Sequence, residues 1–231
     1  MGFKERLYQV LASFGIRLFT RIFPEYFAKD TLAPTDRYIE YPFAVRNLPK
    51  PPARLLDVGC AGSFFPLILA GFGYDAFAVD IRKYAIINKI KYENFRFCNE
   101  SIIKTGFPDN YFDAITAIST VEHIGLSGRY GISEDSSADK IAVAEMKRIT
   151  KPNGIIILTV PFGKAKIIKP FSRIYDRDLI NQLINTLKIE KEEYYMQDSR
   201  DDWYKCTKEE AGEVEATGSR FALCMLALVK R

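Results

Sequence analysis

Apolar runs and helical patterns alternate along most of the chain. Short, nearly continuous apolar runs predict buried strands, whereas apolar residues spaced three or four apart predict helices. The predicted strands are residues 53–58, 75–79, 95–98, 112–118, 154–160, 188–196 and 221–229, and the predicted helices are residues 64–72, 83–91, 137–150 and 176–187. Apolar strands separated by helices are typical of a parallel sheet that is covered on both faces.

The last two predicted strands differ from the others because no helix is predicted between them. The segment that connects them reads as a loop around Trp203. Neighbouring strands joined without a helix pair antiparallel, so we expect a hairpin at the edge of the sheet. The predicted fold is α/β and doubly wound, with a mostly parallel seven-stranded sheet and an antiparallel C-terminal edge hairpin.

Residues 1–27 place apolar side chains at helical spacing with Lys and Arg interleaved, and Pro24 ends the pattern. This pattern predicts a basic amphipathic helix. Such a helix could pack on the main domain, cover a pocket or lie on a membrane surface. Residues 28–52 contain five prolines, which predict an irregular connector. We therefore expect an N-terminal extension over residues 1–52 and a main domain over residues 53–231.

Composition narrows the function classes. With 231 residues, of which 48% are hydrophobic and 27% charged, the chain can bury one substantial core. Its 33 Lys and Arg against 29 Asp and Glu give a net charge of +4, too small for a dedicated nucleic-acid binder, so we expect no nucleic-acid partner. Four scattered cysteines and one histidine disfavour a structural zinc site or a disulfide scaffold.

The sequence shows neither a signal peptide nor a membrane span. Its longest uncharged run, residues 58–74, is shorter than the roughly 20 residues of a membrane-spanning helix and is interrupted by glycines and a proline. We expect a cytoplasmic protein. Peripheral membrane contact through residues 1–27 is an alternative that the sequence leaves open.

A glycine-rich turn after the first predicted strand carries the clearest chemical signal. It spans residues 59–63, and the next strand ends in Asp80. This arrangement lets a ligand approach the backbone while an acidic side chain accepts both hydroxyls of a ribose, so it predicts a nucleoside-containing cofactor. Dinucleotide binding requires the spacing GxGxxG. Here Ala61 and Phe64 occupy the second and third glycine positions, which argues against NAD and FAD.

The same segment, LLDVGCAGS, resembles the first motif of class I S-adenosylmethionine-dependent methyltransferases, which often reads DVGCGTG. The resemblance continues in the expected order through AVDIR, FCNESI, GFPDNYFDAITAISTVEHIG and EMKRITKPNGIIILTVPFG, and it covers roughly residues 55–163. It implies S-adenosylmethionine as the cofactor, the strand order 3-2-1-4-5-7-6 and a methyltransferase-like catalytic domain over residues 53–231.

The resemblance also implies roles for residues that follow the predicted strands. Asp57 and Gly59 would shape the pocket for the methionine part of the cofactor, and Asp80 would hold the ribose hydroxyls. Glu100, or Ser101 if the loop is one residue shorter, would contact the adenine. Alternatively, Asp57 could cap the turn and Asp80 could bind a nearby backbone amide.

Three residues depart from the family pattern. Ala61, which would lie against the cofactor, and Ser63 stand where glycines are usual, and Asn153 stands at the first glycine of the usual Lys-Pro-Gly-Gly. Ala61 adds one methyl group near the ligand, whereas Ser63 can cap the following helix. Ser119 and Thr120, after the fourth strand, would line the path of the methyl group.

His123, the only histidine, lies just beyond the fourth predicted strand on the side expected to bind substrate. It could act as a general base that takes a proton from an acceptor hydroxyl. Alternatively, Glu122 and His123 could orient the loop as a hydrogen-bonded pair. Methyl transfer from a sulfonium does not require a base, because the donor is already activated and alignment supplies much of the acceleration. No metal is expected.

Several classes of methyl acceptor can be excluded from the sequence. Residues 119–122 lack the Asn-Pro-Pro-aromatic type of pattern found in nucleic-acid amino-methyltransferases, and the chain lacks the Pro-Cys motif of cytosine methylation. A small-molecule or lipid-like acceptor remains. The basic stretch 163–173 could receive an anionic substrate or form a solvated loop. There are two alternatives to a methyltransferase. One is a non-catalytic scaffold of the same fold, which could associate with a membrane, and the other is a nucleotide-dependent oxidoreductase.

Overall fold

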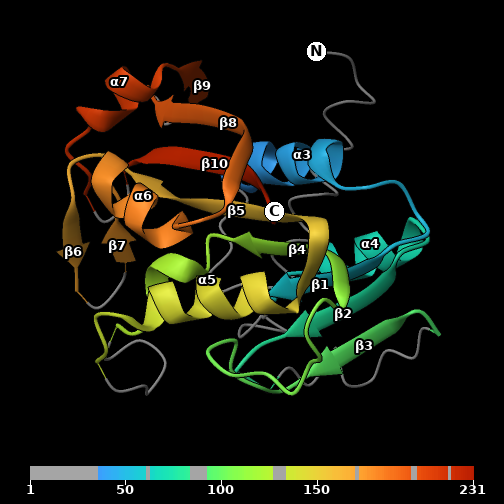
Figure 1. Cartoon of the computed structure of the whole chain (residues 1–231). Coiled ribbons are helices and arrows are strands. Elements are labelled where there is room, and N and C mark those ends of the chain that lie inside the picture. The colour runs from blue at the N-terminus through green and yellow to red at the C-terminus, as the bar shows by residue number, and fades with distance from the viewer. Residues whose placement is uncertain are drawn as a thin grey trace, which may run out of the picture. The chain divides into compact units, whose positions relative to one another are not determined.

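An eight-stranded sheet forms the centre of the computed structural model (Figure 1). The structure describes residues 36–60, 63–83, 93–126, 134–169, 172–198, 202–217 and 220–231. The strands of the sheet are β1 (Arg54–Val58), β2 (Asp75–Val79), β3 (Phe95–Cys98), β4 (Phe112–Ile118), β5 (Thr150–Phe162), β8 (Lys188–Gln197), β9 (Trp203–Cys206) and β10 (Ala222–Val229). The predicted helix over residues 1–27, and nearly all of the one over residues 83–91, lie outside the described residues.

The strand order is β3-β2-β1-β4-β5-β10-β8-β9. Strands β1 to β5 are parallel, whereas β10 is antiparallel to both β5 and β8. The predicted α/β class and the order of the first seven strands are confirmed. The predicted strand count is wrong by one, because β9 pairs with β8 and takes the edge of the sheet.

Strand β9 had read as a loop because a short edge strand needs backbone pairing on one side only and leaves little periodic signal. Its four residues pair with the end of β8, and the helix α7 (Lys208–Gly212) follows it. The basic stretch after β5 also contains structure that was not predicted. It forms the antiparallel hairpin of β6 (Lys166–Ile168) and β7 (Ser172–Ile174).

Helices cover both faces of the sheet (Figure 1). The helices α3 (Arg37–Asn47) and α4 (Phe65–Gly71) pack on one face, and α5 (Ala138–Ile149), α6 (Arg177–Ile184) and α7 pack on the other. Side chains alternate between these two layers, as the strand period of two requires. In β4, for example, Ala114 and Ile118 contact the α3 layer, whereas Ile115 and Ala117 contact the α5 layer.

Helix α3 corrects the prediction of an irregular connector. The helix contains Pro42, which removes one backbone donor. Phe43 and Ala44 are fully buried in the core layer beneath α3. Burial of a side chain such as Phe43 contributes about 1.5–3 kcal/mol, so tertiary packing stabilises a helix that the proline content disfavours. Residues from Tyr38 to Arg231 form one compact unit, and this unit therefore includes nearly all of α3.

Asn153 shows why one departure from the family pattern is tolerated. It adopts a φ of +60° at the turn that interrupts the pairing of β4 with β5. Asn enters this left-handed region more readily than most residues other than glycine. The substitution of glycine by Asn therefore preserves the turn.

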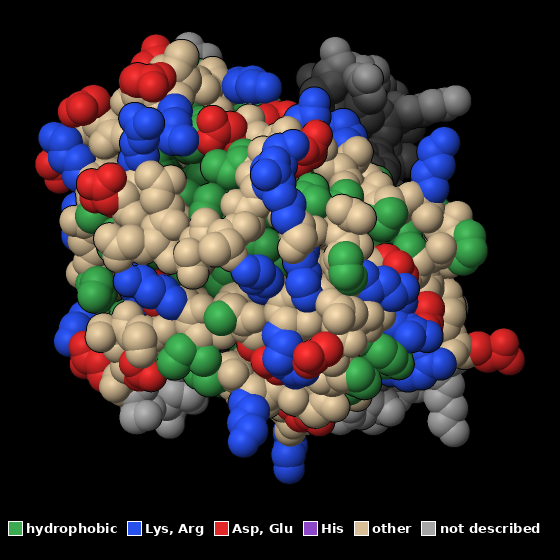
Figure 2. Space-filling model, in the orientation of Figure 1, with side chains coloured by type: hydrophobic (Ala, Val, Ile, Leu, Met, Phe, Trp, Pro, Cys, Tyr) green, Lys and Arg blue, Asp and Glu red, His purple; other side chains and the backbone are tan. Residues whose placement is uncertain are grey.

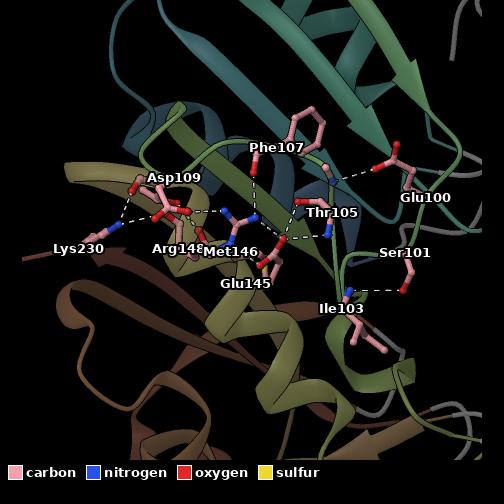
Figure 3. A network of polar contacts seen from close by, with 12 residues as sticks. Glu100, Ser101, Ile103, Thr105, Phe107, Asp109, Glu145, Met146, Arg148 and Lys230 are labelled. Carbon is pink, nitrogen blue, oxygen red and sulfur yellow. Dashed lines mark hydrogen bonds and ion pairs between the residues drawn. The ribbon is translucent and has the colours of Figure 1, made fainter.

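A polar network ties the loop after β3 to the C-terminal end of α5 (Figure 3). Glu145 Oε1 accepts hydrogen bonds from the backbone N (2.9 Å) and the Oγ1 (2.6 Å) of Thr105. Arg148 donates to both oxygens of Glu145 at 2.7 Å and to Phe107 O at 2.9 Å. The bonds from Arg148, supported by those from Thr105, lower the pKa of Glu145 to about 2. The network fixes the loop that contains Glu100 and Ser101.

We expect Glu145→Gln to lower the free energy of unfolding at pH 7 by about 1.5–3 kcal/mol, the range for hydrogen bonds to charged groups. Because the pKa of Glu145 is lowered by folding, its stabilisation is complete above pH 4.5 and is lost as the pH falls towards 2. Urea unfolding at pH 7 and pH 3 measures the difference in unfolding free energy between Glu145→Gln and the wild type. Substitution of the exposed Glu209 by Gln is the control. An equal loss of stability at both pH values would contradict the assignment.

Candidate functional site

Gly59 places the turn after β1 against the segment after β4. Its φ is +76°, and its backbone N donates to Val79 O at 2.9 Å. A Cβ at this position would lie 2.3 Å from Thr120 Cγ2, so only glycine fits. Thr120 Oγ1 in turn donates to Val58 O at 3.1 Å. The structure therefore brings together two segments that the sequence assigned to one site.

Two buried carboxylates lie at the carboxyl ends of neighbouring parallel strands. Asp57 is 4% exposed in β1 and Asp80 is 7% exposed directly after β2. Asp57 accepts a hydrogen bond from Thr116 Oγ1 at 2.6 Å. Asp80 accepts from the backbone N of Arg82 at 2.8 Å and from its guanidinium at 3.3 Å. Asp80 thus makes the local backbone bond that the sequence had suggested as an alternative to ligand binding.

The pKa of Cys60 is affected by the acids at the carboxyl ends of the strands. Burial raises the pKa of its thiol, and the carboxylates of Asp57 and Asp80 raise it further. The thiol therefore remains neutral at physiological pH. Cys60 is not equipped to act as a nucleophile, which requires a thiolate.

The loop expected to contact adenine is held by its own polar groups. Glu100 Oε2 accepts from Gly106 N at 3.4 Å, and Ser101 Oγ accepts from Ile103 N at 3.3 Å (Figure 3). Neither contact decides between Glu100 and Ser101. The connection to Asp80 comes instead from Asn99, whose Nδ2 donates to Asp80 O at 2.8 Å. Asn99 was not among the site residues predicted from the sequence.

The glycine turn is only partly described, because Ala61 lies outside the described residues. Ser63, its last residue, accepts a hydrogen bond from Phe65 N at 3.0 Å in the first turn of α4. Ser63 Oγ also bonds the hydroxyl of Tyr41 at 2.9 Å. The Tyr41 ring stacks on Phe65 with centroids 4.5 Å apart. Helix α3 therefore contacts the glycine turn directly.

Helix α3 also contributes Glu40, a fully buried residue that the sequence analysis missed. Glu40 Oε1 accepts from Ser119 Oγ at 2.6 Å and from Thr159 Oγ1 at 2.5 Å. Ser119 follows β4 with a φ of +42°, and its backbone N donates to Thr159 Oγ1 at 2.9 Å. The spacing of Glu40, Phe43 and Ala44 was a helical signal, but the surrounding prolines obscured it.

His123 ends the short 3-10 helix η2 (Val121–His123). Its Nε2 lies 3.6 Å from Glu122 Oε1, an ion-pair distance if the imidazole is protonated but longer than a hydrogen bond. Arg173 of β7 donates to Ile124 O at 3.3 Å and pairs with Asp139 at 3.2 Å. The β6–β7 hairpin thereby holds the backbone next to His123.

The cations of the basic stretch have carboxylate partners. Arg173 is buried and pairs with Asp139, so it does not belong to a solvated loop. The remaining pairs are Lys164 with Glu213 and Glu215, Lys166 with Glu215, and Lys169 with Glu134. On the face that includes α5 and α6, blue and red side chains are interspersed (Figure 2).

The edge formed by the carboxyl ends of the parallel strands is lined by buried acids. These are Glu40, Asp57, Asp80 and Glu122. Such an edge favours a ligand with positive charge. Within the described ranges, no three His, Cys, Asp or Glu side chains are grouped as metal ligands would be. Nor do those ranges contain a helix long and apolar enough to cross a membrane.

Part of the chain matches a family model and a curated relative. Residues 56–158 match the family model described as a methyltransferase domain. The chain is 29% identical over 150 residues to the sterol 24-C-methyltransferase ERG6B of Gibberella zeae, with 61% of this chain covered. The match spans only 34% of that relative's length.

Two solved structures show the same fold. One is the 1,6-didemethyltoxoflavin-N1-methyltransferase of Burkholderia thailandensis, solved with S-adenosylhomocysteine, with a TM-score of 0.59, 13% identity and coverage of 100% of this chain and 92% of that one. The other is the [4+2]-cyclase SpnF, with a TM-score of 0.59, 16% identity and coverage of 82% and 79%. Residues 56–158 thus match a methyltransferase domain in sequence, and the whole sheet has the fold of these solved structures.

Proposed function

We propose that the protein transfers a methyl group from S-adenosylmethionine to a neutral, lipid-like or other small-molecule acceptor at the carboxyl edge of the sheet. The observation that carries this proposal is the glycine turn at Gly59 flanked by buried acids at Asp57 and Asp80. A turn without Cβ admits the ligand close to the backbone. The acids suit a cofactor that carries a sulfonium and an ammonium group.

In this proposal each residue keeps the part of the cofactor that the family resemblance assigns to it. Asp80 accepts hydrogen bonds from the ribose hydroxyls, and Asp57 and Gly59 shape the pocket for the methionine part. Glu100 or Ser101 meets the adenine in the loop held by Glu145. Ala61, in the same turn, borders the methionine part.

The cofactor supplies a methyl group that is already activated. The chain's own contribution is to align the acceptor with that group and to exclude water. Ser119 and Thr120 line the approach, and Ser119 is fixed by bonds to α3 and β5. His123, 18% exposed in its side chain, stands beside this approach and takes the proton if the acceptor atom carries one.

The acceptor wall is aromatic. Trp203 and Phe221 meet edge to face with centroids 5.6 Å apart and pack against the core layer beneath α3. Both lie near the start of β10, which pairs with the carboxyl end of β5. Trp203 Nε1 is buried without a hydrogen-bond partner among the described residues. An apolar acceptor that carries an oxygen would satisfy this donor, and the similarity to a sterol methyltransferase supports the same class.

The cofactor assignment is tested by calorimetric titration with S-adenosylmethionine, S-adenosylhomocysteine and NADH. We expect binding of the two sulfur ligands but not of NADH. Asp80→Ala should weaken their binding about 10- to 100-fold, the effect of losing hydrogen bonds to a charged group. The exposed Asp178→Ala serves as control and should bind normally. Unchanged affinity in a folded Asp80→Ala variant would exclude the ribose role.

Methyl transfer needs a separate test, because the same fold also serves a cyclase. The protein is incubated with tritiated-methyl S-adenosylmethionine and a panel of sterols and other neutral lipids in detergent micelles. We expect label in at least one lipid, and a fall of about tenfold for Trp203→Ala with unchanged cofactor affinity. Trp203→Phe should retain most of the transfer. Cofactor binding without label in any lipid would contradict the proposed acceptor class.

A further inference from the structure

Glu40 occupies a position that the proposed function does not yet explain. It is the only one of the four edge acids that comes from a helix preceding the sheet, and it is fully buried. Its two hydroxyl partners, Ser119 and Thr159, lie at the carboxyl ends of neighbouring strands. Helix α3 thus delivers a carboxylate to the strand ends where the methyl group is proposed to pass.

Two hydroxyl groups hold one oxygen of the Glu40 side chain. The backbone N of Ser119 can only donate, so Thr159 Oγ1 accepts from it and has its own proton available for Glu40. The two bonds to Glu40 Oε1 are 2.5 Å long from Thr159 Oγ1 and 2.6 Å long from Ser119 Oγ. Two hydroxyls from neighbouring strands therefore hold one oxygen of the Glu40 side chain in place.

A negative charge in a buried position interacts strongly with any cation brought close to it, because water does not screen the interaction. S-adenosylmethionine has a positively charged sulfonium at the reacting centre. Once the methyl group has left, the sulfur of S-adenosylhomocysteine is neutral. The ammonium group is the same in both molecules.

Resting on the proposed function, we propose that Glu40 recognises the sulfonium charge and so makes the site bind S-adenosylmethionine in preference to S-adenosylhomocysteine. Ser119 and Thr159 are positioning residues that hold the carboxylate in place. The attraction disappears when the sulfur loses its charge, so the spent cofactor is released more readily than the donor.

The test compares Glu40→Gln with the wild type by calorimetric titration against three ligands. Gln retains the size and one acceptor oxygen for the two hydroxyls but removes the charge. The ligands are S-adenosylmethionine, S-adenosylhomocysteine and 5′-methylthioadenosine, which lacks both cationic groups. We expect the affinity for S-adenosylmethionine to fall about tenfold while that for the other two changes less than about threefold.

Equal changes for S-adenosylmethionine and S-adenosylhomocysteine, including no change, would overturn the inference. The exposed Glu190→Gln at the start of β8 is the charge-matched control and should leave all three affinities unchanged. Failure of the wild type to bind any of the three would contradict the proposed function itself. Normal binding with an unaltered preference in Glu40→Gln would contradict only the role of Glu40.

A second measurement does not depend on the folding of the variant. Sinefungin carries a protonated amine in place of the methylated sulfur, so it retains positive charge at the reacting centre. The wild-type protein should bind S-adenosylmethionine and sinefungin more tightly than S-adenosylhomocysteine. Binding S-adenosylhomocysteine as tightly as, or more tightly than, both of them would overturn the inference.

Discussion

The burial of carboxylates at the carboxyl ends of parallel strands is the constraint on which the rest of this site depends. Removing an acid from water is costly unless hydrogen bonds compensate it. The hydrogen-bond donors that compensate the buried acids come from different parts of the chain. Thr116 of β4 donates to Asp57, and Arg82 donates to Asp80. These bonds fix the two acids.

The same constraint explains why α3 belongs to the site. The segment after β4 has a partner outside the loops, because Ser119 bonds to Glu40 of α3. Helix α3 is anchored by Phe43 in the core. The same buried face places Glu40 against Ser119 and Thr159, and Tyr41 reaches the glycine turn. Packing in the core thereby sets the geometry of polar groups at the edge.

The sequence predicted most of the central sheet because buried parallel strands are continuous apolar runs. The bounds of β2, β3 and β4 coincide with the predicted ones. The misses have common physical causes. Strand β9 pairs on one edge and needs no apolar pattern, and α3 is stabilised by tertiary contacts against its local proline signal.

At the site, the sequence could place residues that follow a strand but could not place partners distant in the chain. Gly59 and Asp80 stand where the strand–turn–helix pattern put them. Glu40 lies 79 residues from Ser119, and no local pattern predicts such a pairing. For the same reason the contact of Arg173 with the backbone beside His123 emerges only from the fold.

The most direct test of this account is a crystal structure of the full chain with S-adenosylhomocysteine. The account predicts the ribose hydroxyls on the Asp80 carboxylate, the methionine part beside Gly59, and the sulfur facing the segment from Ser119 to Thr120 next to Glu40. A ligand bound away from Asp80, or with its sulfur turned away from Ser119, would contradict it.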